Sequence, residues 1–150
     1  MDFETGWTEE YATGIEGIDR DHQFLFELVS NLIHAPEQEH FENIQSAIQV
    51  LIEYTNYHFE KEESLMQLFA YPDVDEHIQQ HHVLSEQISE YAEKFNRHSQ
   101  HFDYSEFCEF MIGWLIDHII GSDMAYRPFI DDISKADAHL QSYKLIDGTP

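Results

Sequence analysis

Residues 51–65 read LIEYTNYHFEKEESL. Spacings of three and four separate Leu51, Thr55, His58, Glu62 and Leu65, which places these side chains on one stripe of an α-helix. A stripe that faces a protein core is ordinarily apolar, so the histidine and the glutamate within it need partners inside the protein. Because His58 and Glu62 are four residues apart, their side chains lie roughly 5–6 Å apart on one face and can bind the same ion.

The same spacing recurs along the chain and predicts four amphipathic helices. Their stripes run through Ile15, Ile18, His22, Leu25, Val29 and Leu32 in the first; Phe41, Ile44, Ile48, Leu51, Thr55, His58, Glu62, Leu65 and Phe69 in the second; Val74, His77, His81, Leu84, Ile88, Tyr91 and Phe95 in the third; and Tyr104, Phe107, Met111, Trp114, His118 and Gly121 in the fourth. Short connections between long helices favour antiparallel neighbours. We therefore predict an all-α protein, an up-down-up-down antiparallel four-helix bundle with an N-terminal arm and a short C-terminal helical tail.

Residues that end or begin helices support this division. Pro36 is expected to end the first helix, and the run Tyr71-Pro72-Asp73 to separate the second from the third. Asp103 with Glu106 three residues later resembles a capping box at the start of the fourth helix.

Composition limits the class of protein. Of the 150 residues, 42% are hydrophobic, which is enough for one domain with a buried core. The formal net charge of −23 argues against nucleic acid and anionic membranes as partners. The single cysteine, Cys108, cannot form an intramolecular disulfide bond, which favours a reducing compartment. The N-terminus lacks the basic region and apolar run of a signal peptide, so we expect a cytoplasmic protein.

Histidine interrupts every predicted stripe, at His22, His58, His77, His81 and His118. A lone histidine on an apolar face is usually a core residue with one hydrogen-bond partner. Left poorly satisfied, however, each of these rings and Glu62 would cost about 2 kcal/mol, and the sum would rival the whole stability of a typical domain, about 5–15 kcal/mol. A bound metal is the most economical partner for all of them. The remaining histidines fall off the stripes or outside the helices and are expected at the surface: His34, His40, His82, His98, His101 and His139.

Asp123 follows His118 by five residues, which is off the regular stripe. Gly121 lies between them and lowers the cost of a distorted turn. Spacing alone leaves open whether Asp123 is a solvated acid near a helix end or a further metal ligand.

These residues resemble the haemerythrin family, in particular its bacterial members. The similarity extends from Trp7 to about Ile130 and rests on Trp7, Gly14-Ile15, Ile18-Asp19, His22, Tyr54 through His58, Phe59, Glu62-Glu63, Met66, Tyr71-Pro72, His77, His81, Trp114-Leu115, His118-Ile119 and Asp123.

The resemblance implies two iron ions that share two bridging carboxylates, Glu62 and Asp123, and an oxo or hydroxo group. One iron would be bound by His77, His81 and His118, and the other by His22 and His58. With two histidines only, the second iron keeps a vacant position, where molecular oxygen is expected to bind reversibly. Imidazole does not by itself select iron over zinc, copper or nickel, so the choice of iron depends on the resemblance. Phe26, Trp114, Leu115 and Ile119 are expected to keep water away from this site.

An oxidising di-iron enzyme is the main competing interpretation. Such enzymes use paired Glu-x-x-His motifs on two helices. This chain has one such motif, from Glu37 to His40, beside Pro36 and off the stripe. A histidine-rich site favours reversible binding of oxygen, so we expect that the protein is not an enzyme. The alternative is a di-iron oxidoreductase that acts on peroxide or nitric oxide.

The C-terminal residues leave a second choice open. We divide the chain into a four-helix domain of residues 1–133 and a tail or linker of residues 134–150. The domain is either an oxygen carrier or store, or an oxygen- or redox-sensing domain whose native protein continues into a C-terminal output domain.

Overall fold

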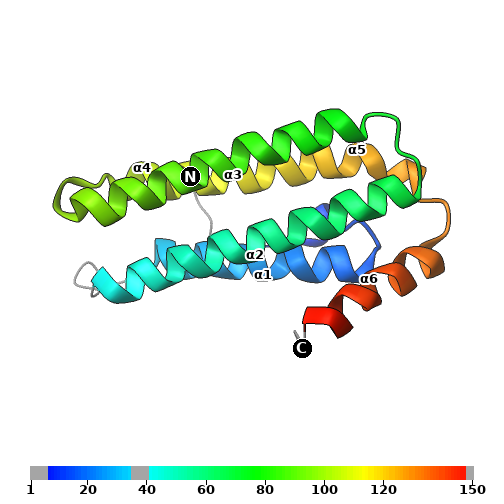
Figure 1. The fold of residues 1–150 in the computed structure, drawn as a ribbon, viewed down its shortest axis with the longest axis horizontal. Coiled ribbons are helices and arrows are strands. Elements are labelled where there is room, and N and C mark those ends of the chain that lie inside the picture. The colour runs from blue at the N-terminus through cyan, green and yellow to red at the C-terminus, as the bar shows by residue number, and fades with distance from the viewer. Residues whose placement is uncertain (1–6, 35–40, 148–150) are drawn as a thin grey trace.

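A bundle of four long helices forms the body of the protein. The computed structural model describes residues 7–34 and 41–147, and within them no strand occurs. The helices are α1 (Glu16–Ile33), α2 (Phe41–Leu68), α3 (Val74–His98) and α4 (Tyr104–Asp117), with sequential neighbours antiparallel (Figure 1). Helix α2 packs against α1 and α3, and α1 also packs against α4. The predicted four-helix bundle is confirmed.

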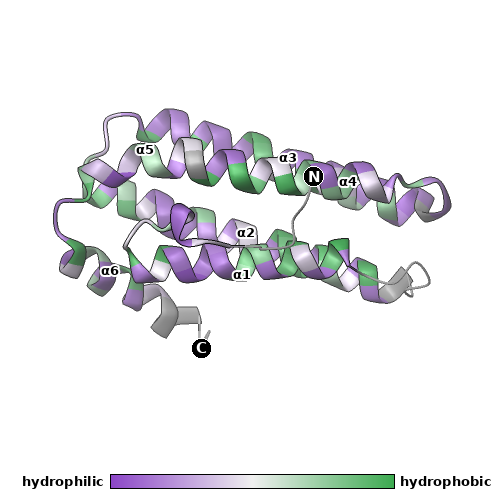
Figure 2. Ribbon diagram, turned by 180° about the vertical axis from the view of Figure 1, so that it is seen from behind, coloured by the Kyte–Doolittle hydropathy of each residue, from purple (hydrophilic) through white to green (hydrophobic). Residues whose placement is uncertain are grey.

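Most described residues of the predicted stripes are buried and form the core. The stripe of α1, for example, is buried from Ile18 through His22 and Leu25 to Val29 and Leu32. Hydrophilic residues occupy the other faces of the helices, so that both kinds of residue appear along each one (Figure 2). Among the described residues, none of the helices combines the length and the hydropathy that crossing a membrane requires.

The expected helix boundaries agree with the structure where it describes them. Helix α1 ends at Ile33, and Pro36 lies outside the described residues. Between α2 and α3, the backbone N–H of Tyr71 donates to the carbonyl of Met66 at 3.0 Å. At the start of α4 the carboxylate of Asp103 accepts from the backbone N–H of Glu106 at 2.9 Å, which caps the helix.

The N-terminal arm is fixed to the start of α1 by Asp19. Its carboxylate accepts hydrogen bonds from the backbone and the hydroxyl of Thr13, each at 2.8 Å, and from the backbone N–H of Gly14 at 3.1 Å. Gly14 has a φ of 82°, a conformation that favours glycine. Arg127 donates to the carbonyl of Thr13, which joins the arm to the segment after α4.

The predicted helical tail is a helix, α6 (Ile133–Asp147), that lies against α1 and α2 at one end of the bundle (Figure 1). Ala136 and Leu140 are buried in a second apolar cluster, together with Ile18, Met66 and other residues of that end. The side chain of Leu140 fills the space beside Gly17, where an added Cβ would lie 3.0 Å from its Cδ1. The boundary between residues 133 and 134 thus falls at the start of a packed helix, and the division into two units stays a prediction.

Candidate metal centre

All seven side chains singled out in the sequence converge in the interior of the bundle. Helices α1 to α3 provide five of them, and the segment that follows α4 provides two. None is more than 7% exposed. They are His22 from α1, His58 and Glu62 from α2, His77 and His81 from α3, and His118 and Asp123 from η3 (His118–Asp123).

A π-helical turn brings Asp123 onto the face of His118. Helix α4 continues without interruption into η3, and the N–H of Met124 donates to the carbonyl of Ile119, five residues back. This wider turn aligns residues five apart, and His118 Nε2 lies 3.0 Å from Asp123 Oδ1. Gly121 is exposed with open space where a Cβ would be, so the expectation that it continues the buried stripe is wrong.

The seven residues form two groups that share their carboxylates. His77, His81 and His118 make up one group and His22 with His58 the other, and Glu62 and Asp123 belong to both. In each group the candidate ligand atoms lie within 4.8 Å of one another.

Each shared carboxylate directs one oxygen to each group. Glu62 Oε1 lies 3.0 Å from both His77 Nε2 and His81 Nε2, whereas Oε2 lies 3.4 Å from His58 Nε2. Asp123 Oδ1 lies 3.0 Å from His118 Nε2, whereas Oδ2 lies 3.0 Å from His22 Nε2. The arrangement suits two cations bridged by two carboxylates.

Several of these atoms lie close together without forming hydrogen bonds. Neither His22 Nε2 nor either oxygen of Asp123 has a hydrogen-bond partner of acceptable geometry among the described residues, although the two side chains approach to 3.0 Å. The same holds for His58 Nε2. Buried polar atoms without partners are costly, and atoms directed at a common space rather than at one another are typical of a metal-binding site. The residues present therefore fit a metal.

The electrostatics of the cluster favour positive charge. Burial opposes protonation of His58, but its hydrogen bond with Asp21 and the negative charges of Glu62 and Asp21 outweigh burial and raise its pKa to about 10. His118 has its pKa raised to about 10 because Asp123 and Glu62 outweigh its burial. Burial alone would raise the pKa of Glu62, yet hydrogen bonds from the surrounding histidines hold it well below its usual value. The cluster therefore attracts cations, whether protons or metal ions.

Sequence reasoning assigned no contact with the cluster to three polar residues that lie behind it. Asp21 Oδ2 lies 3.0 Å from His58 Nδ1, and Glu63 Oε2 lies 3.3 Å from His81 Nδ1. The hydroxyl of Tyr126 donates to Glu62 Oε2 at 3.1 Å. Asp21 immediately precedes His22, and Glu63 immediately follows Glu62, so adjacency to a candidate ligand was the available signal.

An aromatic side chain, Phe59, borders the cluster. Phe59 stacks on the ring of His81, with the centroids 3.8 Å apart and the planes 5° from parallel. The four residues expected to exclude water are all buried: Phe26, Trp114, Leu115 and Ile119.

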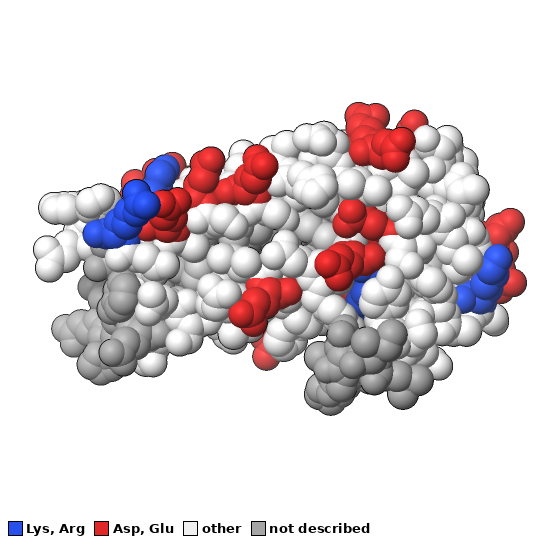
Figure 3. All heavy atoms as spheres, viewed as in Figure 1, with Lys and Arg blue, Asp and Glu red and all other residues white. Residues whose placement is uncertain are grey.

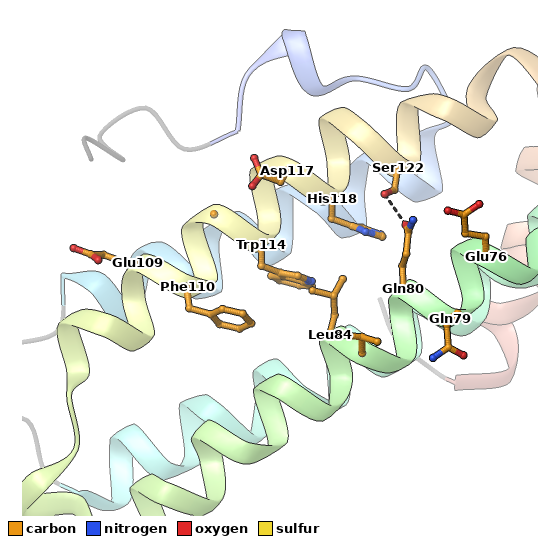
Figure 4. Close-up of a pocket in the computed structure, with 12 residues that line it drawn as sticks. Glu76, Gln79, Gln80, Leu84, Glu109, Phe110, Trp114, Asp117, His118 and Ser122 are labelled. Carbon is orange, nitrogen blue, oxygen red and sulfur yellow. Dashed lines mark hydrogen bonds between the residues drawn. The ribbon is translucent and has the colours of Figure 1, made fainter. Parts of the chain in front are cut away.

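A groove of about 660 Å³ between α3 and α4 approaches the cluster (Figure 4). Leu84, Phe110 and Trp114 contribute apolar lining, and His118 lines the groove between Trp114 and Ser122 (Figure 4). Asp117 and other carboxylates border it, in keeping with the many acidic side chains on the surface (Figure 3). The groove thus approaches the three-histidine group and not the group of His22 and His58.

The other histidines lie mostly where the sequence predicted. Four are exposed: His34, His82, His98 and His101. His40 is outside the described residues. His139 is half-buried on α6, less exposed than these four, and hydrogen-bonds to Ser64 Oγ at 2.7 Å.

Comparisons with known proteins agree with this geometry. Residues 13–130 match the model of the Hemerythrin HHE cation binding domain. The chain is 29% identical over 138 residues to a bacteriohemerythrin of Stenotrophomonas maltophilia (strain R551-3), covering 91% of this chain and 84% of that one. It is 30% identical over 120 residues to a bacteriohemerythrin of Pseudomonas aeruginosa (strain LESB58), covering 80% and 77%. A crystal structure of wild-type hemerythrin superposes with a TM-score of 0.78 at 25% identity, over 86% of this chain and 99% of that chain.

Proposed function

The chain belongs to the haemerythrin family, and we propose that it is a non-haem di-iron protein that binds molecular oxygen reversibly. The observation that carries the proposal is the pair of shared carboxylates. Glu62 and Asp123 each present one oxygen to the three-histidine group and the other to the two-histidine group. We propose all seven residues as metal ligands, with a solvent-derived oxo or hydroxo group as a further bridge.

The donor set fits iron. Imidazole and carboxylate groups bind iron well, although imidazole also binds zinc, copper and nickel, and membership of the family favours iron. Two ferrous ions, when bound, would supply the two electrons that reversible oxygen binding requires.

The two groups are unequal, which assigns them different roles. Glu62 and Asp123 complete five protein donors with the three histidines of one group, but only four with His22 and His58. We infer that the group of His22 and His58 is where a small external ligand binds.

The residues near the site favour reversible binding of oxygen over the release of reduced oxygen products. Phe26, Leu115 and Ile119 are at most 2% exposed, so they exclude bulk water and the protons it carries. Histidine outnumbers carboxylate among the candidate ligands, which favours reversible binding over cleavage of the oxygen molecule.

Anaerobic reconstitution with ferrous iron tests the proposal. The expected result is two irons per chain and an absorption change on exposure to oxygen that reverses under argon. One metal per chain, or an absorption change that does not reverse, would overturn it. Steady consumption of peroxide or nitric oxide would identify an oxidoreductase instead.

An oxygen-sensing domain is a second candidate function, and one contact favours it. Helix α6 packs on α1 and α2, the helices that carry His22, His58 and Glu62. A change at the centre could therefore alter the packing of the C-terminal helix and, through it, a C-terminal output domain.

A further inference from the structure

A buried carboxylate outside both ligand groups contacts the outer nitrogen of His58. Asp21 is 3% exposed and lies on α1, one residue before His22. Its Oδ2 lies 3.0 Å from His58 Nδ1 on α2. A carboxylate can only accept here, so Nδ1 carries the hydrogen, and a metal ion bound at the centre would take the place of the proton on Nε2.

We propose that Asp21 is a positioning residue that fixes the tautomer and orientation of His58 and thereby retains the metal ion of the group of His22 and His58. The inference rests on the proposed di-iron function and extends it to a residue outside the ligand set. Outer hydrogen bonds of this kind orient a ligating ring and strengthen it as a donor, and their loss typically lowers metal affinity by about 10–100-fold.

Two further contacts hold Asp21 in place. The hydroxyl of Tyr54 donates to Oδ1 at 2.9 Å, and Lys61 Nζ lies 2.9 Å from Oδ2. Lys61 is itself 5% exposed, and its ammonium group lies 5.0 Å from the centroid of the Tyr57 ring. A carboxylate with three partners from α2 has little freedom to rotate, so the position of His58 is determined by the contact between α1 and α2.

The contact between Asp21 and His58 matters more for the two-histidine group than the contact between Glu63 and His81 does for the three-histidine group. On the three-histidine side, Glu63 Oε2 is 3.3 Å from His81 Nδ1, and the Glu63 side chain is 22% exposed. Two further histidines remain there if His81 shifts. In the two-histidine group, Nδ1 of His22 has no partner among the described residues, so His58 is the ring whose orientation a carboxylate holds.

Metal retention by matched variants tests the inference. Asp21→Leu removes the carboxylate and with it every hydrogen-bond acceptor of this side chain, but leaves Lys61 buried without its partner, so the double variant Asp21→Leu with Lys61→Met is made as well, which removes both charges. Glu63→Gln is the matched control, because it removes the outer carboxylate of the other group. Each metal-free protein is loaded with Co²⁺, and the number of bound ions and their transfer to a chelator are followed by absorption.

The wild-type protein is expected to bind two Co²⁺ ions per chain. The double variant should keep one ion at the wild-type rate and lose the other about 10–100-fold faster. Glu63→Gln should not lose the ion of the two-histidine group faster. The inference would be overturned if the double variant released both ions at the wild-type rate, or if it released both ions faster by the same factor. A wild-type protein that binds fewer than two ions would instead count against the proposed function.

A nuclear magnetic resonance signal separates positioning from a general loss of structure. In the zinc-loaded wild-type protein, the Nδ1 proton of His58 should resonate downfield and exchange slowly. Tyr54→Phe, which keeps the carboxylate, should retain this resonance, and the double variant should lose it while the backbone spectrum persists. An unchanged His58 resonance in the double variant would also overturn the inference.

Discussion

Asp123 Oδ1 lies 3.0 Å from His118 Nε2, although five residues separate the two in the sequence. In a regular α-helix a residue five positions on is turned by about 140° from the first, because successive residues rotate by about 100°. The π-helical turn reduces this difference and lets one continuous helix supply two candidate ligands, His118 and the shared carboxylate of Asp123. The geometry of the candidate metal centre therefore depends on a local departure from α-helical geometry.

Removing the ring of His118 is expected to reduce both metal content and stability. His118→Ala deletes a candidate ligand and leaves Asp123 Oδ1 without its nearest ring. Bound metal should fall below two ions per chain, and the unfolding free energy should drop by at least about 1–3 kcal/mol, the cost of an unsatisfied buried group. Elemental analysis and thermal melting measure the two effects. His82→Ala, at an exposed position on α3, should change neither.

Tyr126→Phe should destabilise the protein by about 1–2 kcal/mol without changing its fold. The hydroxyl of this fully buried tyrosine donates to Glu62 Oε2 at 3.1 Å, so the substitution leaves a carboxylate oxygen with one partner fewer. Chemical denaturation compares the two proteins. Tyr143→Phe on α6 is the control; equal destabilisation of both variants would contradict a specific role for the Tyr126–Glu62 contact.

The metal-free protein should lose stability at both ends of the pH range. The pKa values of His58 and His118 are raised to about 10 and that of His77 to about 9, so their stabilising contribution is complete below about 6.5 and is lost as the pH rises through 9 to 10. The pKa values of Glu62 and Asp123 are lowered, so their contribution is present above about 4.5 and is lost as the pH falls below that. Melting temperatures between pH 3 and pH 11 measure this, and a flat profile above pH 8 would contradict it.

Metal loading should raise the melting temperature, because the partnerless nitrogen and oxygen atoms of His22, His58 and Asp123 then gain a partner. Acidification of the loaded protein should release metal, since protons compete for the same imidazoles and carboxylates. Calorimetry of both forms, and metal analysis after dialysis at decreasing pH, check these expectations. Equal melting temperatures for the metal-free and loaded forms would refute the first.

Hydrogen exchange of α6 distinguishes a sensor from a carrier. If the centre signals through this helix, the protection of residues 133–147 should differ between the diferrous, oxygenated and diferric forms. Leu140→Ala, which removes the side chain that packs beside Gly17, should raise exchange in α6 in all three forms. Identical exchange of wild-type α6 in all three forms would favour the carrier.

The sequence alone determined the four helices and the inward position of six of the seven converging side chains. The reason is that helical periodicity is local: His58 and Glu62, or His77 and His81, share a face at any place in a protein where the segment is helical. Asp123 could be assigned only through resemblance to the family, because a π-helical turn has no distinct periodic signal.

Tertiary structure alone decided which residues meet across helices. Asp21 lies one position off the stripe of α1, and only the packing of α1 against α2 brings it to His58. The same applies to Tyr126 beside Glu62 and to His139 beside Ser64, pairs that are 64 and 75 residues apart in the sequence. Such contacts depend on how far each helix is rotated and shifted against its neighbour, and the interlocking of side chains in the assembled core sets both.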